Sequence, residues 1–345
     1  MTKRERVLRA IEFRRPDRVP FTSGVPGTTD VFLMPVSPAR NWQPDPPYYP
    51  DVYPEVYYLG NWRFRRFMPP DLQSPGYERQ DEFGCVWKTY IENNIGEVVG
   101  HPLRSLDEVD TFPLPDPHAP GRFAAFELYR RMFAGNCFVL GMMYNGMWER
   151  MHFLRGFSEL LMEVATEPEK VGRLADRLVD EWYVPLVERF AGYGCDGVIF
   201  TDDWGTQDRP MISPKSWREI FRPRYERLFS SIHERGMKAF MHSCGHIRAL
   251  LPDLVDAGLD VLQKDDMWFM GLEELAEDFS GRLCFMGMLD IQRVMPGASR
   301  KKVFEETRRL IKALGRSDGG LIGMYYFQPA AAGCTWRQMA WMRMA

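Results

Sequence analysis

The stretch that decides the fold is KAFMHSCGHIRALLPDLVDAGLDVLQK at residues 238–264. It begins and ends with a short apolar run, and an amphipathic segment separates the two runs. Short apolar runs bounded by polar turns are typical of buried strands, and the segment between them is typical of a helix that packs on a sheet. The order strand, helix, strand therefore predicts two parallel strands.

The same alternation extends over residues 136–330, which we interpret as regular βα units. The strands predicted from apolar runs are 137–143, 197–203, 238–243, 260–264, 283–289 and 321–327, with residues 18–22 as a first strand near the N-terminus. This pattern predicts an α/β protein, and we favour a (β/α)8 TIM barrel whose eighth strand lies in the irregular N-terminal region. No glycine-rich phosphate loop follows any of these strands, which disfavours dinucleotide and P-loop folds.

Capping residues predict where several helices begin. Thr2 is expected to cap a helix over residues 3–13, and Thr166 one with Pro168 in its first turn. Ser213 opens a segment that runs to Gly236, and Ser299 opens one that Gly315 ends.

Residues 17–120 differ from the rest of the chain. They hold many of the 26 prolines and a dense set of Trp and Tyr residues, so we expect an irregular, proline-rich elaboration with a two-stranded ribbon around 83–99. We expect the whole chain, 1–345, to form one barrel domain.

Composition limits the possible partners. The chain has 44 Lys and Arg against 47 Asp and Glu, without the basic excess of a nucleic-acid-binding protein. Its first 20 residues lack a signal-peptide apolar core, and no later segment has an uninterrupted apolar run long enough for a membrane span. The six cysteines include no CxxC pair, so we expect most of them to be reduced and buried. We therefore expect a cytoplasmic protein that acts on a small molecule.

The end of the predicted strand 238–243 carries the strongest chemical signal. His242 and Cys244 lie two residues apart, so their side chains point to the same side of the chain. They also lie at the carboxyl end of the strand, which is the functional end of a parallel barrel. Imidazole and thiolate are zinc ligands, and Cys334 is our first candidate for a third ligand, with Cys284 behind it. A buried thiol beside a hydrogen-bonded histidine is the alternative.

Further polar residues follow other strand ends. Asp202 and Asp203 are adjacent, so only one of them is expected to enter the barrel, where we predict Asp203 as a catalytic group. The substrate-binding candidates are Asp202, Gln207, Gln263, Asp290, Gln292 and Tyr325. Tyr144, Trp148 and Tyr326 could wall the same mouth or pack in the core.

One motif is better interpreted as coincidence. Residues 116–121 fit the DxHxxG pattern by which corrinoid proteins bind cobalt, with His118 as the ligand. They lie in a proline-rich linker instead of between a strand and a helix, so we expect no cobalt ligation by His118.

Taken together, several motifs resemble the uroporphyrinogen decarboxylase-like superfamily. They are ERVLRAIEFRRPDRVP at 5–20, DDWGTQ at 202–207, HSCGHI at 242–247 with LVDAGLDVLQ at 254–263, and MGMLDIQ at 286–292. The resemblance covers residues 2–330 and implies an (α/β)8 barrel with its active site in the cleft.

The resemblance implies two activities. In cofactor-free decarboxylation of uroporphyrinogen, arginines of an N-terminal segment bind the substrate's carboxylates, but after Pro20 this chain has no arginine until Arg40. In methyl transfer from methylcobalamin to a thiol, zinc is held by the HxC pair and a later cysteine. His242 and Cys244 match, and Cys334 lies nearer the chain end than the family's cysteine.

We therefore expect a zinc- and corrinoid-dependent methyltransferase that moves a methyl group to a thiol or similar acceptor. A decarboxylase of uroporphyrinogen or a related acid in tetrapyrrole metabolism is the alternative. The methyl donor is expected to arrive on a separate corrinoid protein, with the aromatic segment 41–70 as part of the contact surface.

Overall fold

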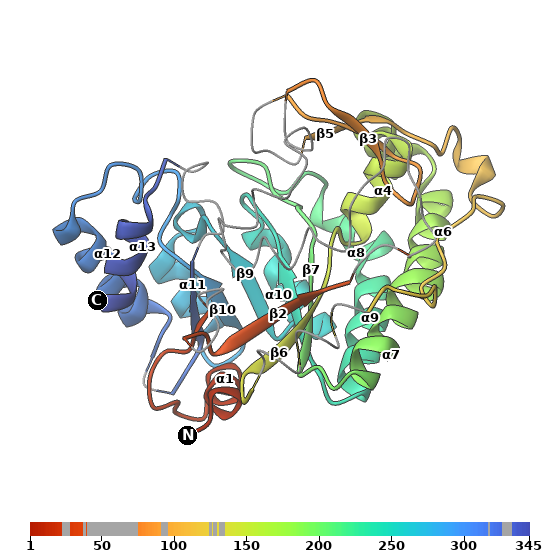
Figure 1. The fold of residues 1–345 in the computed structure, drawn as a ribbon. Helices are drawn as coiled ribbons and strands as arrows, with labels where there is room; N and C mark the ends of the chain where they lie inside the picture. Colours follow the sequence, from red (N-terminus) through yellow and green to blue (C-terminus); the bar gives the residue numbers. More distant parts are fainter. Residues whose placement is uncertain are drawn as a thin grey trace.

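The computed structural model describes residues 1–22, 28–36, 39, 75–90, 96–123, 126, 130, 135–316, 318–325 and 333–345. The chain folds into eight parallel strands in the order β1-β11-β10-β9-β8-β7-β6-β2, which form a nearly closed barrel (Figure 1). The strands are β1 Phe21–Thr22, β2 Val31–Pro35, β6 Phe138–Met143, β7 Gly197–Thr201, β8 Lys238–His242, β9 Val261–Lys264, β10 Cys284–Gly287 and β11 Leu321–Met324. The TIM-barrel prediction is confirmed, and β2 is the eighth strand that was expected in the N-terminal region.

The strands are apolar because both of their faces are covered. All six residues of β6 are buried, and so are all four of β9 and of β10. Parallel strands with side chains in the barrel on one face and helices on the other show this continuous apolar pattern.

One helix, α1 Lys3–Ile11, precedes the first strand, and helices follow β6 to β11. The other helices of the described residues are α4 Met147–Arg155, α5 Phe157–Thr166, α6 Pro168–Leu178, α7 Val184–Gly192, α8 Pro214–Ile220, α9 Arg222–Glu234, α10 Leu251–Ala257, α11 Leu272–Phe279, α12 Arg300–Ala313 and α13 Trp336–Met344. A π-helical turn, Val179–Tyr183, joins α6 to α7, and short 3-10 turns lie at Leu106–Glu108, Arg248–Leu250 and Met267–Met270. None of the helices in these described ranges has the length and apolarity that a membrane span requires.

Three predicted helix starts are confirmed. The hydroxyls of Thr2, Ser213 and Ser299 each accept a hydrogen bond from the backbone N–H three residues on, which caps α1, α8 and α12.

Two helix predictions are wrong. Thr166 is the last residue of α5, where its hydroxyl donates to the carbonyl of Met162 four residues back, and it caps nothing. The segment that begins at Ser213 is two helices, because Pro223 cannot donate a backbone hydrogen bond near the start of α9.

The region between β2 and β6 contains an antiparallel sheet of three strands instead of the predicted two. These are β3 Glu78–Gln80, β4 Val86–Lys88 and β5 Glu97–Gly100, in the order β3-β4-β5. Arg122 fixes the chain beyond this sheet, since its buried guanidinium makes a bidentate ion pair with Glu82 at 2.8 and 2.9 Å.

One buried carboxylate holds the two ends of the barrel together. Asp30, just before β2, is fully buried and accepts hydrogen bonds from Arg6 at 2.9 Å, from Arg18 at 2.7 and 2.9 Å, and from the backbone N–H of Phe21 at 2.8 Å. The N–H of Asp30 in turn donates to the carbonyl of Phe21 at 2.7 Å. Asp30 therefore links α1, β1 and β2 through side-chain and backbone bonds.

Replacing Asp30 with Asn should lower the free energy of unfolding by about 3 kcal/mol, because Arg6 then keeps a largely buried charge with a weaker partner. Urea unfolding followed by circular dichroism measures the change. Asp17→Asn is the matched control, because Asp17 also pairs with Arg6 but its side chain is 43% exposed, and we expect about 1 kcal/mol or less there. Equal losses in the two variants would contradict this role for Asp30.

Candidate functional site

A row of polar side chains crosses the carboxyl ends of three neighbouring strands. Thr201 at the end of β7 is the register partner of His242 at the end of β8, and His242 is the register partner of Gln263 in β9. Register partners in adjacent strands point to the same face of a sheet, so these side chains lie side by side at the end of the barrel where active sites form.

The loops that follow β7 and β8 contact each other backbone to backbone. A side chain at Gly245 would drive its Cβ into the carbonyl of Gly205, and one at Gly205 would place its Cβ 2.5 Å from the N of His246. Gly245 also has a φ of +75°, which disfavours any other residue. The N–H of His246 donates to the carbonyl of Thr206 at 2.7 Å. Two glycines thus allow the DDWGTQ and HSCGH segments to meet.

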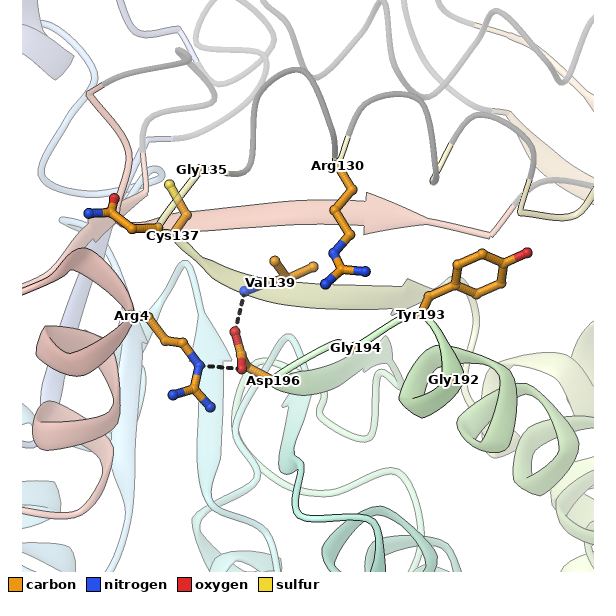
Figure 2. A pocket seen from close by; sticks show the side chains of 10 residues that line it. Arg4, Arg130, Gly135, Cys137, Val139, Gly192, Tyr193, Gly194 and Asp196 are labelled. Atoms are coloured by element: carbon orange, nitrogen blue, oxygen red, sulfur yellow. Dashed lines mark hydrogen bonds and ion pairs between the residues drawn. The ribbon is translucent and has the colours of Figure 1, made fainter.

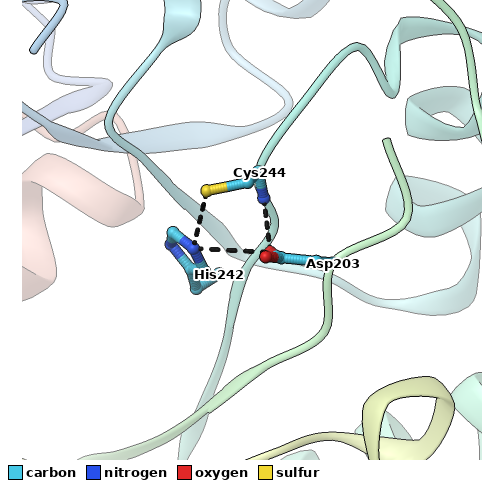
Figure 3. Close-up of side chains that lie close together, drawn as sticks. All are labelled: Asp203, His242 and Cys244. Carbon is cyan, nitrogen blue, oxygen red and sulfur yellow. Dashed lines mark hydrogen bonds and ion pairs between the residues drawn. The ribbon is translucent and has the colours of Figure 1, made fainter. Parts of the chain in front are cut away.

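This contact brings Asp203 to the His-x-Cys pair. The Asp203 carboxylate accepts from the backbone N–H of Cys244 at 2.6 Å and lies 3.5 Å from Nε2 of His242. The Sγ of Cys244 lies 3.3 Å from the same Nε2, so the three side chains converge on one point (Figure 3). One ligand atom from each lies within 4.8 Å of the other two, and this is the group of possible metal ligands found in the described part of the chain.

The orientation of His242 is fixed from behind by an amide. Nδ1 of His242 bonds to Oε1 of Gln263, and Nε2 of Gln263 donates to the carboxylate of Asp265 at 2.9 Å. Because the Gln263 oxygen can only accept, Nδ1 carries the proton and Nε2 faces Cys244 and Asp203. This is the tautomer that binds a metal through Nε2.

Burial and acidic neighbours determine the protonation of the site. Burial alone would lower the pKa of His242, but Cys244, Asp203 and Asp265 together raise this pKa well above its usual range. Burial raises the pKa of the Cys244 thiol, although His242 opposes that shift. A bound metal would displace any proton on Nε2 of His242 and the thiol proton of Cys244, and would leave the proton on Nδ1 in its bond to Gln263.

The two distances that join His242 to the other side chains of the triad fit a zinc ion. Tetrahedral zinc places a histidine nitrogen about 3.5 Å from a cysteine sulfur and about 3.4 Å from a carboxylate oxygen. The corresponding distances here are 3.3 and 3.5 Å. The set combines nitrogen, sulfur and oxygen donors, all of which zinc accepts.

Asp202 faces away from this group. It is fully buried, its carboxylate accepts from the backbone N–H of Trp148 and Glu149 at 3.2 and 2.9 Å, and Tyr225 donates to it as well. Burial, with the nearby charge of Glu149, raises its pKa to about 8. Asp202 therefore satisfies the N-terminus of α4, and Asp203 is the carboxylate that lies beside His242 and Cys244. A substrate-binding role for Asp202 stays a prediction.

The other predicted substrate-binding residues are distributed around the rim. Gln207 and Gln292 are exposed, and Tyr325 is half-buried against the rings of Phe21 and Trp336. Asp290 is buried and accepts from the backbone N–H of Gln292 and Arg293 at 2.8 Å each. Among these candidates Gln263 is the one that bonds directly to a member of the triad formed by Asp203, His242 and Cys244.

The aromatic residues proposed as walls have different positions. Trp148 is fully buried and stacks on Trp204 with ring centroids 4.8 Å apart, which is core packing. Tyr144 is 39% exposed, and Tyr326 lies outside the described residues.

The remaining cysteines are not in the triad. Cys334 is buried shortly before α13 and is not part of the group around His242, so its role as a third ligand stays a prediction. Cys284 is buried within β10, where burial raises the pKa of its thiol. The six cysteines form no disulfides.

Sequence reasoning missed Glu149. This residue of α4 is buried, accepts from the hydroxyl of Thr201 at 2.7 Å, and has its pKa raised by burial and by the charge of Asp203. The available signal in the sequence was the position of Glu149 shortly after the predicted strand 137–143. The sequence did not show that Asp202 binds the N-terminus of α4, and this contact is what places Glu149 beside Thr201.

A cavity of about 740 Å³ lies at the opposite end of the strands (Figure 2). Asp196, just before β7, accepts there from Nε of Arg4 at 2.6 Å and from the N–H of Val139 at 2.9 Å. The residues predicted for the site are not among those that line it, and contacts at this end of a barrel serve stability.

The DxHxxG match is a turn in the structure. The N–H of His118 donates to the side chain of Asp116 at 2.8 Å, and His118 itself is exposed, with no strand before it or helix after it in residues 101–123. The aromatic segment 41–70 lies outside the described residues.

The family model described as uroporphyrinogen decarboxylase (URO-D) matches residues 81–323, which is most of the chain. The chain belongs to this family. The family assignment confirms the resemblance of the sequence motifs and includes both loops that build the triad.

Similar proteins within the family have two kinds of activity. A methylated-thiol–coenzyme M methyltransferase of Methanosarcina mazei is 25% identical over 178 residues, which cover 51% of this chain and 46% of that protein. A uroporphyrinogen decarboxylase of Geobacillus kaustophilus is 26% identical over 197 residues, 53% of each. The matched region thus spans about half the length of these curated relatives.

The fold has a full-length counterpart among solved structures. A methyltransferase from Methanosarcina mazei superimposes with a TM-score of 0.69 at 14% identity, covering 100% of this chain and 99% of that one. At this identity the likeness shows the fold alone.

Replacing Gly245 with Ala should disrupt the contact between the two loops and lower the free energy of unfolding by about 3 kcal/mol, since the added Cβ meets the backbone of Gly205. Gly236→Ala is a matched control, because Gly236 has a similar φ of +72° but nothing within 4 Å of the added Cβ. Strain alone should then lower the stability by about 1 kcal/mol. Urea unfolding measures both, and a loss at Gly245 no larger than that at Gly236 would show that the loops do not depend on this contact.

Proposed function

We propose that this protein is a zinc-dependent methyltransferase that transfers a methyl group from a corrinoid to a thiol. The observation that carries the proposal is the convergence of His242, Cys244 and Asp203 on one point, with Nε2 of His242 at distances from the Cys244 sulfur and the Asp203 carboxylate that match tetrahedral zinc ligands. Zinc, when bound, lowers the pKa of a thiol and maintains the nucleophilic thiolate at neutral pH.

His242 and Cys244 would hold the metal through Nε2 and Sγ, and Asp203 would be the third protein ligand. The Gln263 amide keeps the Nδ1 proton of His242 in place, so Nε2 presents its lone pair. Three protein ligands leave the fourth position for the acceptor thiol, as in catalytic zinc sites.

The surroundings of the site favour a thiol over a polycarboxylate substrate. The carboxyl groups of Asp203 and Asp265 are among the neighbours that raise the pKa of His242, and Glu149 adds a further carboxyl group beside Thr201. Uroporphyrinogen carries eight carboxylates, and these would be repelled by Asp203 and Asp265 unless arginines faced them. Decarboxylation is therefore the second candidate function, supported by the decarboxylases among the relatives.

We also propose that the methyl donor is presented by a separate corrinoid protein that docks over the carboxyl ends of the strands. The exposed turn around His118 supports this arrangement, since a cobalt-binding DxHxxG motif belongs between a strand and a helix. We further propose that residues 1–345 act as one domain with the donor bound outside the barrel.

The protein purified with zinc in the buffer should retain close to one zinc per chain after dialysis, and Cys244→Ser should lose most of it, because a thiolate ligand is removed. Plasma mass spectrometry measures the metal. Cys284→Ser is the control, because Cys284 is buried in β10 outside the triad. A chain that is fully active without metal would contradict the proposal.

Two further variants identify the third ligand. Asp203→Asn should weaken zinc binding by about 10- to 100-fold, whereas Cys334→Ser should leave it unchanged. The opposite result would assign the ligand role to Cys334, as expected from the sequence, and would make the assignment to Asp203 wrong.

Incubation with methylcobalamin and coenzyme M should produce the methyl thioether of coenzyme M. The loss of absorbance of the methyl–cobalt bond measures the rate of this reaction. We expect Cys244→Ser to reduce the rate by at least about a hundredfold and His118→Ala to leave it unchanged. In a parallel anaerobic assay with uroporphyrinogen III, the appearance of coproporphyrinogen without thiol methylation would favour the decarboxylase.

A further inference from the structure

A buried lysine lies directly behind the His-x-Cys turn. Lys264 is fully buried at the end of β9, and its Nζ is surrounded by three oxygens: Oδ1 of Asp266 at 2.5 Å and the carbonyls of Ser243 and Gly245 at 3.1 and 2.5 Å. An ammonium group has three N–H donors, so these oxygens match its capacity. The two carbonyls belong to the residues on either side of Cys244.

Asp266 holds the same turn from its other side. Its Oδ2 accepts from the backbone N–H of Gly245 at 3.1 Å, and its side chain is 6% exposed. The ion pair thus contacts the backbone of the HSCGH turn at three points, while Asp203 holds the N–H of Cys244 at a fourth.

Side chains alternate in direction over residues 263–266, at the end of β9 and just after it, and the two sides have different roles. Gln263 and Asp265 lie on one side and orient the imidazole of His242, whereas Lys264 and Asp266 lie on the other and bind backbone. One four-residue segment therefore supports both members of the His-x-Cys pair, the imidazole by a side-chain bond and the thiol through its backbone.

Packing alone gives no reason for this ion pair. Removing two charges from water is costly, and apolar side chains of similar size are often as stable in such positions. Here the donors and acceptors of the pair bond to the backbone of one turn. The role of the pair is therefore to fix the conformation of that turn. Gly245 needs this support, since its left-handed φ of +75° and its contact with Gly205 restrict the turn to one conformation.

We propose that the Lys264–Asp266 pair is a positioning device that fixes the backbone of Cys244 so that its Sγ faces Nε2 of His242 before any metal binds. The Nζ of Lys264 bonds to Asp266 and to the backbone on either side of Cys244, so Lys264 acts through that backbone as a positioning residue. The consequence for zinc affinity depends on the proposed function, whereas the preformed turn does not.

The test compares a double variant, Lys264→Met with Asp266→Asn, with the wild-type chain. The double variant leaves no unpaired buried charge, and the amide oxygen introduced by Asp266→Asn can still accept from Gly245, but the carbonyls of Ser243 and Gly245 lose their donor. Competition with a chromophoric chelator should show zinc affinity reduced by about 10- to 100-fold. Unchanged affinity would overturn the proposal.

A control removes a lysine–carboxylate pair of another element, in which the lysine side chain is 51% exposed. Lys302 and Glu306 pair at 2.6 Å on α12, and Lys302→Met with Glu306→Gln should leave zinc affinity unchanged. Asp266→Asn alone keeps Lys264, whose Nζ can still donate to both carbonyls, so we expect a loss of no more than a few-fold. A loss in this single variant as large as in the double variant would contradict the role given to Lys264.

Hydrogen exchange of the metal-free chains provides a measurement that needs no zinc, and its wild-type part needs no variant. Amides of residues 243–246 should be protected to about the same degree as those of β8, and in the double variant they should exchange about tenfold faster. A wild-type turn that is unprotected without metal would overturn the proposal. If the turn is protected but the chain binds no zinc, the proposed function fails and the positioning role of Lys264 remains.

Discussion

The hydrogen bond from the N–H of Cys244 to the Asp203 carboxylate is the interaction on which the candidate site depends. It joins two loops that follow neighbouring strands, and it is possible because Thr201 and His242 are register partners and because Gly205 and Gly245 let the backbones meet. Without this bond Asp203 would be a solvent-facing carboxylate, and His242 and Cys244 would be two donors without a third.

Around this bond, buried polar groups of neighbouring elements hold the members of the triad and the side chains beside them. Asp202 accepts from the first amides of α4, which places Glu149 beside Thr201. Gln263 orients His242, and Lys264 holds the backbone on both sides of Cys244. Precise placement of donors by buried hydrogen bonds is what a metal site with an open position requires.

The sequence predicted the parts of the structure that depend on local pattern. Apolar runs located β6 to β11 because strands buried on both faces have continuous apolar sequences, and the period of two placed His242 and Cys244 on one side. It did not predict β2 as a specific strand or the break between α8 and α9, since their boundaries depend on tertiary pairing and on Pro223. Glu149 and Lys264 were missed for a related reason: their roles come from bonds to residues on neighbouring strands, which no spacing within one segment reveals.

The central claim is that His242, Cys244 and Asp203 form a zinc site. The most direct measurement is anomalous diffraction at the zinc absorption edge, recorded from crystals of the wild-type protein grown with zinc. The account predicts one strong anomalous peak bonded to Nε2 of His242 and Sγ of Cys244, at about 2.1 and 2.3 Å. Fully zinc-loaded crystals with no peak between these two atoms would contradict it.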